Sequence, residues 1–208
     1  TSKPTALFSN TQIENPNLML EGMPNYRSGV DGLRVSNSNK GGITFAASTT
    51  QNGIHMITVV LGVDAVDGDP YARFVATSSL MNYVVRTFVP SIVVKEGDPY
   101  GKSKATIMDG KSETVLAVAK KDFYIVEKQG SQAEPKIQFK SNQESFRAPV
   151  KSGTSLGKLH YTDPDKIGRG YLEDQEPTVD MVAGRTVEKS FFLKVWWNEF
   201  VRYVNEKL

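Results

Sequence analysis

The sequence predicts a mainly β protein with some helix, of the α+β class. Short apolar segments rich in β-branched residues recur along the 208 residues and are separated by turn-forming Gly, Pro and Asn. Two longer segments, at about 70–87 and 185–208, instead carry apolar residues at helical spacing. These changes in texture divide the chain into regions of residues 1–90, 91–184 and 185–208.

Composition is that of an ordinary soluble globular protein, with 39% hydrophobic and 23% charged residues. The net charge is only +2, and no run of Lys and Arg is interleaved with aromatic residues, so no nucleic-acid partner is expected. The sequence has no cysteine and two widely separated histidines, which leaves little from which to build a zinc site. We therefore expect no metal and no cofactor. No apolar run approaches the roughly 20 residues that a membrane-spanning helix needs.

The clearest β signals lie in residues 29–62. Asn52 and Gly53 predict a hairpin, because both tolerate positive φ. The run Val59-Val-Leu61 is nearly continuous in apolar side chains, which is typical of a strand covered on both faces. We predict three adjacent antiparallel strands: Gly32–Ser36, Gly42–Ser48 and Ile54–Leu61.

A helix is predicted to follow, from about Pro70 to Thr87. Asp69 suits the N-cap, and Pro70 suits the first helical position, where its missing N–H costs nothing. Asp64, Asp67 and Asp69 raise the alternative of a calcium site, but no glutamate stands at the twelfth position of an EF-hand loop, so an acidic turn is favoured. One face of the helix is expected to pack on the sheet. Its residues are Phe74, Ser78, Met81 and Val85, with Val84 and Phe88 beside them.

From Ile92 to about Ala183 the pattern changes to short strands at regular intervals. Gly- and Pro-containing turns separate them, which is typical of a small antiparallel β-sandwich. The predicted strands are Ile92–Val94, Ala105–Met108, Val115–Ala119, Phe123–Glu127, Lys136–Phe139, Lys158–Tyr161 and Val179–Val182.

The last segment, about Arg185 to Leu208, is predicted to form an amphipathic helix. At 100° per residue its apolar side chains fall within an arc of roughly 180°. They are Phe192, Leu193, Trp196, Trp197, Phe200, Val201, Tyr203, Val204 and Leu208. A face with two tryptophans and two phenylalanines suits the headgroup region of a bilayer, so we interpret it as membrane-binding. The alternative is a helix that packs this face on its own β-rich domain.

Residues Gly29–Gly62, together with the stretch Asp69-Pro-Tyr-Ala-Arg-Phe-Val-Ala-Thr-Ser-Ser-Leu-Met-Asn-Tyr83, resemble the serine-type D-alanyl-D-alanine carboxypeptidases. These are the low-molecular-mass penicillin-binding proteins of peptidase family S11, and the resemblance is to the streptococcal type over nearly the whole chain. It implies a C-terminal portion, with most of the catalytic domain N-terminal to Thr1. Residues 1–28, which alone suggest an irregular surface segment, would wrap around that domain.

The resemblance also implies partners and a location. The full-length family removes the terminal D-alanine from peptidoglycan stem peptides through an acyl-serine intermediate, and binds β-lactams. Its β-rich C-terminal domain carries no catalytic residue, and its C-terminal segment attaches to membranes. We therefore expect a peripheral protein on the extracellular face of the membrane of a Gram-positive cell.

Catalysis in this family uses a Ser-x-x-Lys, a Ser-x-Asn and a Lys-Thr-Gly on an edge strand. The resemblance aligns Lys-Thr-Gly with Arg34, Val35 and Ser36, and an oxyanion-hole N–H with Asn37. Arg34 keeps the positive charge of the lysine, but carries it on a planar guanidinium group in place of a compact ammonium group. Val35 lacks the hydroxyl that orients the substrate carboxylate, and Ser36 adds a side chain where close approach needs none. Catalytic residues are thus expected to be missing from this chain.

Two local matches to these motifs are set aside. Ser155-Leu-Gly-Lys158 fits Ser-x-x-Lys literally, but the motif needs a helical turn, and Gly157 in a β-rich region argues against one. Lys40-Gly41-Gly42 falls in a predicted turn, and His55 is expected at a surface or edge position. Two functions remain open: part of a carboxypeptidase-like protein, inactive as this chain alone, or a non-catalytic, membrane-tethered binding or spacer module.

Overall fold

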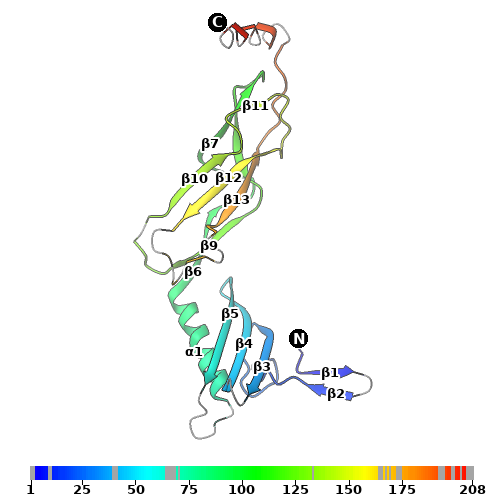
Figure 1. Cartoon of the computed structure of the whole chain (residues 1–208), viewed down its shortest axis with the longest axis vertical. Helices are drawn as coiled ribbons and strands as arrows, with labels where there is room; N and C mark the ends of the chain where they lie inside the picture. The colour runs from blue at the N-terminus through cyan, green and yellow to red at the C-terminus, as the bar shows by residue number, and fades with distance from the viewer. Residues whose placement is uncertain are drawn as a thin grey trace. The chain divides into compact units, whose positions relative to one another are not determined.

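The structure is a computed structural model, and its chain forms two compact units (Figure 1). The first contains Thr1–Pro90 and Val126–Ser131, and the second contains Ser91–Ile125 and Gln132–Leu208. The mainly β, α+β class predicted from the sequence is confirmed. The structure describes residues 3–8, 11–38, 42–63, 69, 71–132, 134–163, 166, 168, 170–171, 175–191, 195–197, 200–201 and 203–204.

The first unit contains the predicted antiparallel sheet, in the order β3-β4-β5. Its strands are β3 (Val30–Ser38), β4 (Gly42–Gln51) and β5 (Ile54–Val63). The hairpin between β4 and β5 turns at Asn52 and Gly53, with φ values of 52° and 77°, as predicted. The helix α1 (Ala72–Thr87) packs on β4 and β5, and Phe74 meets Phe45 edge-on at 5.1 Å between ring centroids.

A second hairpin precedes this sheet, where the sequence predicted an irregular segment. Strand β1 (Thr5–Phe8) pairs with β2 (Thr11–Glu14), from Thr5 opposite Glu14 to Phe8 opposite Thr11. Each strand is only four residues long and mixes polar with β-branched or apolar residues, which gave no strong period. The prediction of irregular structure is therefore wrong for these eight residues.

The helix begins two residues later than predicted. Tyr71 is its N-cap and makes no side-chain capping bond. Asp69 instead accepts a hydrogen bond of 2.8 Å from the backbone N–H of Tyr71, so its carboxylate closes the turn ahead of the helix. Pro70, Asp64 and Asp67 lie outside the described residues. The buried face contains Phe74 and Met81 as predicted, and also Arg73 and Thr77.

Strand β5 is covered on one face only, which contradicts the prediction of burial on both. Ile54 and Val60 are buried in the unit. The alternate residues Ile57, Val59 and Leu61 are 62%, 56% and 74% exposed, because only one face of this sheet carries α1. The opposite face of the sheet is therefore an apolar surface within the described part of the chain.

The second unit is built on a six-stranded sheet in the order β10-β12-β13-β8-β7-β11. A two-stranded sheet of β6 and β9 contributes Val94 and Ile125 to the same core, whose centre contains Leu156, Leu159 and Met181. All the predicted strands are present. The structure adds one strand that was not predicted, β11, whose two residues pair in parallel with β7. The strands are β6 (Phe88–Val94), β7 (Pro99–Met108), β8 (Thr114–Ala119), β9 (Phe123–Lys128), β10 (Lys136–Ser141), β11 (Phe146–Arg147), β12 (Ser155–Thr162) and β13 (Thr178–Ala183).

Gly157 allows β12 to approach β10 closely. A Cβ atom at this position would lie 2.1 Å from the backbone oxygen of Lys140 and 2.8 Å from the Cα of Ser141. These are main-chain atoms of a paired strand, so no rotamer change removes the clash. We expect Gly157→Ala to lower the free energy of unfolding by about 3 kcal/mol, measured by urea denaturation. The control Gln138→Ala, at an exposed position of β10, should change it by less than about 0.5 kcal/mol. Equal stability of the two variants would contradict this account of β12.

Candidate functional site

The strand β3, which contains the predicted counterpart of the family's Lys-Thr-Gly motif, forms one edge of its sheet. It pairs with β4 and with no other strand in the described part of the chain. Arg34, Ser36 and Asn37 are exposed, whereas Val35 is half-buried and packs on the core of the first unit. The residues Arg34, Val35, Ser36 and Asn37 stand opposite Ala46, Phe45, Thr44 and Ile43 of β4.

The two faces of β3 differ in character. Val35 shares the face of its partner Phe45, which is 1% exposed and contacts Phe74 of α1. Because side chains alternate along a strand, Arg34 and Ser36 belong to the opposite face. An apolar residue at position 35 therefore suits its neighbours, and the polar character of this edge comes from Arg34, Ser36 and the backbone.

Arg73 lies beneath this edge and was missed by the sequence analysis. Its side chain is 5% exposed, and its Nη1 donates to the backbone oxygens of Ser36 (3.2 Å) and Thr44 (3.3 Å). It therefore holds α1 to both strands at Ser36 and Thr44. Burial lowers the pKa of the Arg73 guanidinium from its ordinary value. In the sequence Arg73 precedes Thr77 and Met81 by four and eight residues, which places it on the same side of the helix, but this spacing does not reveal its backbone partners on β3 and β4.

The local motif matches do not form a catalytic site. Ser155 and Lys158 lie on the strand β12, as expected, and the Ser155 hydroxyl accepts a hydrogen bond of 3.3 Å from Asn142 Nδ2. His55 is exposed on β5, as predicted. Lys40 and Gly41 lie outside the described residues. Among those that are described, no group of three His, Cys, Asp or Glu side chains could hold a metal ion.

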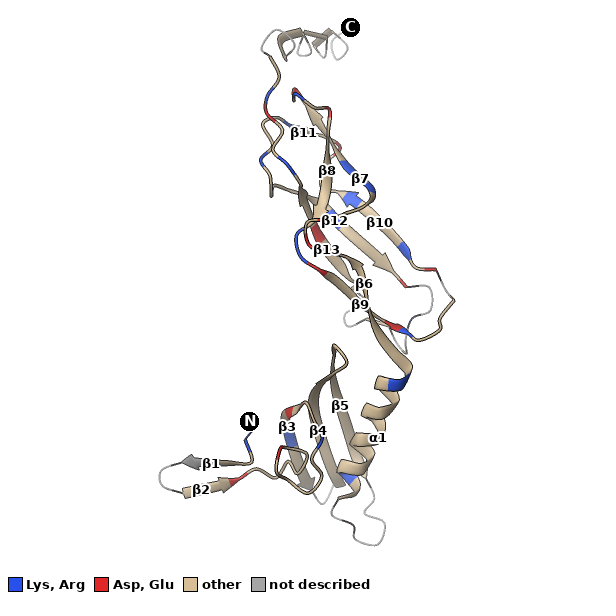
Figure 2. Cartoon of the chain, turned by 180° about the vertical axis from the view of Figure 1, so that it is seen from behind, with Lys and Arg blue, Asp and Glu red and all other residues tan. Residues whose placement is uncertain are grey.

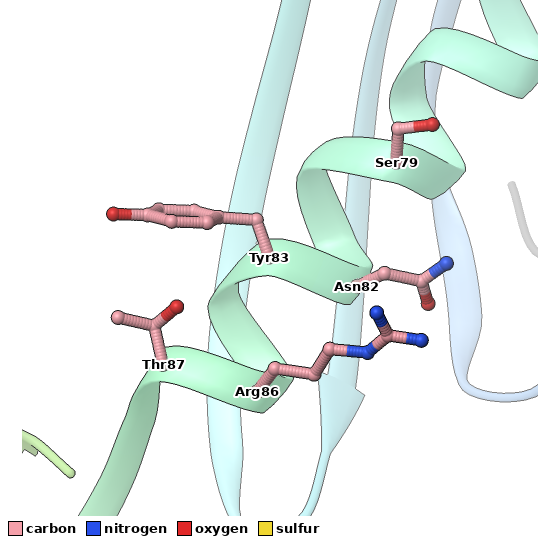
Figure 3. Close-up of a pocket in the computed structure, with 5 residues that line it drawn as sticks. All are labelled: Ser79, Asn82, Tyr83, Arg86 and Thr87. Atoms are coloured by element: carbon pink, nitrogen blue, oxygen red, sulfur yellow. The ribbon is translucent and has the colours of Figure 1, made fainter.

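A hollow of about 400 Å3 lies along the exposed side of α1 (Figure 3). Figure 3 shows Asn82 and Arg86 pointing to one side of the helix and Tyr83 to the other. The Asn82 side-chain oxygen also accepts a hydrogen bond of 2.8 Å from Arg27 Nη1. These groups diverge from one helix and do not converge on a ligand. The full set of lining residues is Ser79, Asn82, Tyr83, Arg86 and Thr87.

The predicted C-terminal helix begins later than expected. Val187 and Lys189 form bridges to Val150 and Gly110, so the stretch 185–190 is not helical. The reason is that Val187 is buried in the core of the second unit and anchors the chain there. The helical residues that the structure describes beyond it are 195–197, 200–201 and 203–204.

This segment presents aromatic rings to solvent. Trp196 and Trp197 are 61% and 57% exposed, and Phe200 and Tyr203 are also exposed. Trp196 stacks on Phe200 at 6.1 Å between ring centroids, and Trp197 lies 6.0 Å from the same ring. Val201 is exposed and Val204 half-buried, whereas Phe192 and Leu193 lie outside the described residues. None of the helices in the described part of the chain is long and apolar enough to cross a membrane.

Comparisons with known proteins find relatives among the penicillin-binding proteins that the sequence resembles. Residues 88–189 match the family model of the penicillin-binding protein 5 C-terminal domain. The D-alanyl-D-alanine carboxypeptidase DacA of Haemophilus influenzae is 26% identical over 169 residues, covering 80% of this chain and 39% of the relative. DacA of Escherichia coli is 23% identical over 166 residues, with 80% and 38% covered.

Solved structures extend the likeness to both units. The crystal structure of a peptidoglycan synthesis regulatory factor (PBP3) from Streptococcus pneumoniae is 44% identical, with a TM-score of 0.84, over 90% of this chain and 51% of that one. Penicillin-binding protein 5 of Haemophilus influenzae shares the fold, with a TM-score of 0.58 at 21% identity, over 90% and 50% of the two chains. This chain spans about two fifths of the curated relatives. Residues 88–189 thus match the C-terminal domain of penicillin-binding protein 5, and the chain as a whole is similar to the C-terminal portion of the low-molecular-mass penicillin-binding proteins of the D-alanyl-D-alanine carboxypeptidase family.

Proposed function

We propose that this chain is a non-catalytic C-terminal portion of a carboxypeptidase-like penicillin-binding protein that takes part in peptidoglycan maturation. The names of the relatives supply the reaction, cleavage of D-alanyl-D-alanine. The whole protein would act on stem peptides and would be acylated by β-lactams at a serine outside this chain. Within the chain, Arg34, Val35 and Ser36 occupy the positions of the expected Lys-Thr-Gly.

The chain would sit on the outer face of the cell membrane as a peripheral protein. The observation that supports this is the group of exposed rings on the C-terminal helix, Trp196, Trp197, Phe200 and Tyr203. Exposed tryptophan and tyrosine are suited to the interface, where the ring is buried among lipid and its polar edge stays hydrated. The test is sedimentation of the intact chain with phosphatidylcholine vesicles, for which we expect binding that changes little with salt. Failure to bind would contradict this proposal and support the alternative, in which the helix packs its apolar face on its own domain.

The alternative function, a membrane-tethered binding or spacer module, is favoured by the departure from Lys-Thr-Gly on β3. The two functions differ in whether β3 is a substrate edge. We expect that Arg34→Lys, Val35→Thr and Ser36→Gly together, in a protein that carries the Ser-x-x-Lys and Ser-x-Asn motifs, raise β-lactam acylation by about 10-fold or more. A hydrogen bond to a charged group, here the ligand carboxylate, contributes roughly 1.5–3 kcal/mol.

The matched control is Arg34→Lys alone, which keeps one positive charge but restores neither the hydroxyl nor the glycine. Its acylation rate should stay near that of the parent, as followed with a fluorescent penicillin in stopped flow. If the triple variant is also unchanged, β3 is not the substrate edge, and the spacer function gains support.

A further inference from the structure

A hollow of about 460 Å3 lies on the six-stranded sheet of the second unit, on the face away from the core. Leu159 and Tyr161 of β12 are buried in that core, so the alternate residues Lys158 and His160 face outward. The volume is within the range of small-molecule sites and exceeds what a single inorganic ion needs. The residues that line it are Lys158, His160, Lys166, Gln175, Glu176 and Thr178.

Strand register places a second lysine, Lys140, beside Lys158, which lines this hollow. Lys140 of β10 stands directly opposite Lys158 of β12, and both are exposed (basic residues are blue in Figure 2). Like charges directly opposite each other destabilise a sheet. Asp180 of β13 stands opposite Lys158 on its other side. The carboxylate of Glu176 accepts a hydrogen bond of 2.8 Å from the Thr162 hydroxyl. Neither carboxylate stands opposite Lys140 in the strand register, and an anion held by both lysines would relieve the repulsion between them.

Uncharged hydrogen-bonding groups lie in the next row of the sheet. His160 stands between Gln138 and Thr178. Burial lowers the pKa of the His160 imidazole most, Lys140 and Lys158 lower it further, and Glu176 opposes them. The lowered pKa favours the neutral imidazole, which offers one donor and one acceptor. This row is suited to hydroxyl groups.

We propose that this hollow binds a phosphorylated, hydroxyl-rich molecule, with its phosphate at Lys140 and Lys158 and its hydroxyls at His160 and Thr178. Phosphate is preferred to carboxylate because the cations are ammonium groups. These act as point charges, whereas planar carboxylates are matched by the guanidinium fork of arginine. This binding function is independent of catalysis and of the C-terminal helix, because Lys140, Lys158, His160 and Thr178 all lie on the strands β10, β12 and β13.

The test uses glycerophosphoglycerol, a soluble phosphodiester whose charge is constant between pH 5 and 8, with the His160 ring followed by NMR. We expect a saturable shift of its resonances and a rise in the pKa of His160, because a bound anion stabilises the imidazolium. Lys140→Gln with Lys158→Gln should weaken binding by about 10-fold or more. It should change thermal stability little, because the lost repulsion between Lys140 and Lys158 offsets the lost attraction between Lys158 and Asp180.

The matched control Lys104→Gln with Lys121→Gln removes the same charge from exposed positions of the same unit and should leave the affinity unchanged. Glycerol and acetate should give no saturable shift. Equal loss in both double variants, an equal response to acetate, or no response to the phosphodiester would overturn the proposal. Phosphatidylglycerol vesicles, which carry the same group, distinguish the source: a response to vesicles alone would overturn a soluble ligand and assign the hollow to lipid headgroups.

Discussion

Replacement of Trp196 and Trp197 by alanine is expected to release the chain from phospholipid vesicles. Both rings are more than half exposed in the free chain, and they lie beside the exposed Phe200. A tryptophan ring buries on the order of 150–250 Å2, and at about 25 cal/mol per Å2 a partial burial contributes about 2 kcal/mol for each ring. Loss of both should lower the partition coefficient by about 1000-fold. Co-sedimentation with sucrose-loaded phosphatidylcholine vesicles measures it directly.

The control is Lys194→Ala with Arg202→Ala in the same segment. The stretch from Arg185 to Leu208 has five basic and three acidic side chains, so the attraction of an anionic surface for it should be secondary. This variant should bind almost as well as the parent, and circular dichroism should show both variants folded. The opposite ranking would identify an electrostatic anchor in place of an aromatic one.

Local signals were enough to predict most strands of this fold. Asn52 and Gly53 fix a tight hairpin because few other residue pairs adopt positive φ at both positions. In the second unit the turn residues recur between short apolar runs, so each strand except β11 was identified without knowledge of its partners. The helix begins later than predicted because the Asp69 carboxylate accepts a hydrogen bond from the Tyr71 N–H and closes a turn ahead of the helix. In the sequence, an aspartate that closes such a turn cannot be distinguished from one that caps the helix.

Features that depend on distant parts of the chain could not be predicted. The run Val59-Val-Leu61 indicates burial on both faces, but the number of covering layers is not a property of the strand itself. From the sequence alone, Arg73 would be expected to face solvent. The structure shows that it donates hydrogen bonds to backbone oxygens of two strands, β3 and β4. The pairing of Lys140 with Lys158 depends on the register of β10 and β12, which the sequence of neither strand reveals.

The purified chain is expected to form no covalent adduct with a fluorescent penicillin and to release no D-alanine from a D-Ala-D-Ala peptide. Its one Ser-x-x-Lys sequence is Ser155–Lys158, which lies on β12 with Gly157 against the backbone of β10. A helical turn, which would bring the lysine amine to the serine as a base, cannot form in that strand without losing the pairing with β10.

The magnitude of this effect is set by the nucleophile, because loss of a catalytic serine in a serine hydrolase lowers the rate by about a million-fold. Intact-protein mass spectrometry after incubation with penicillin detects an adduct of even a small fraction of the chain, and a full-length carboxypeptidase relative serves as the positive control. Ser155→Ala should be indistinguishable from the parent. A stoichiometric adduct that maps to Ser155 and disappears in this variant would show that β12 supports acylation, and that the chain is an enzyme in its own right.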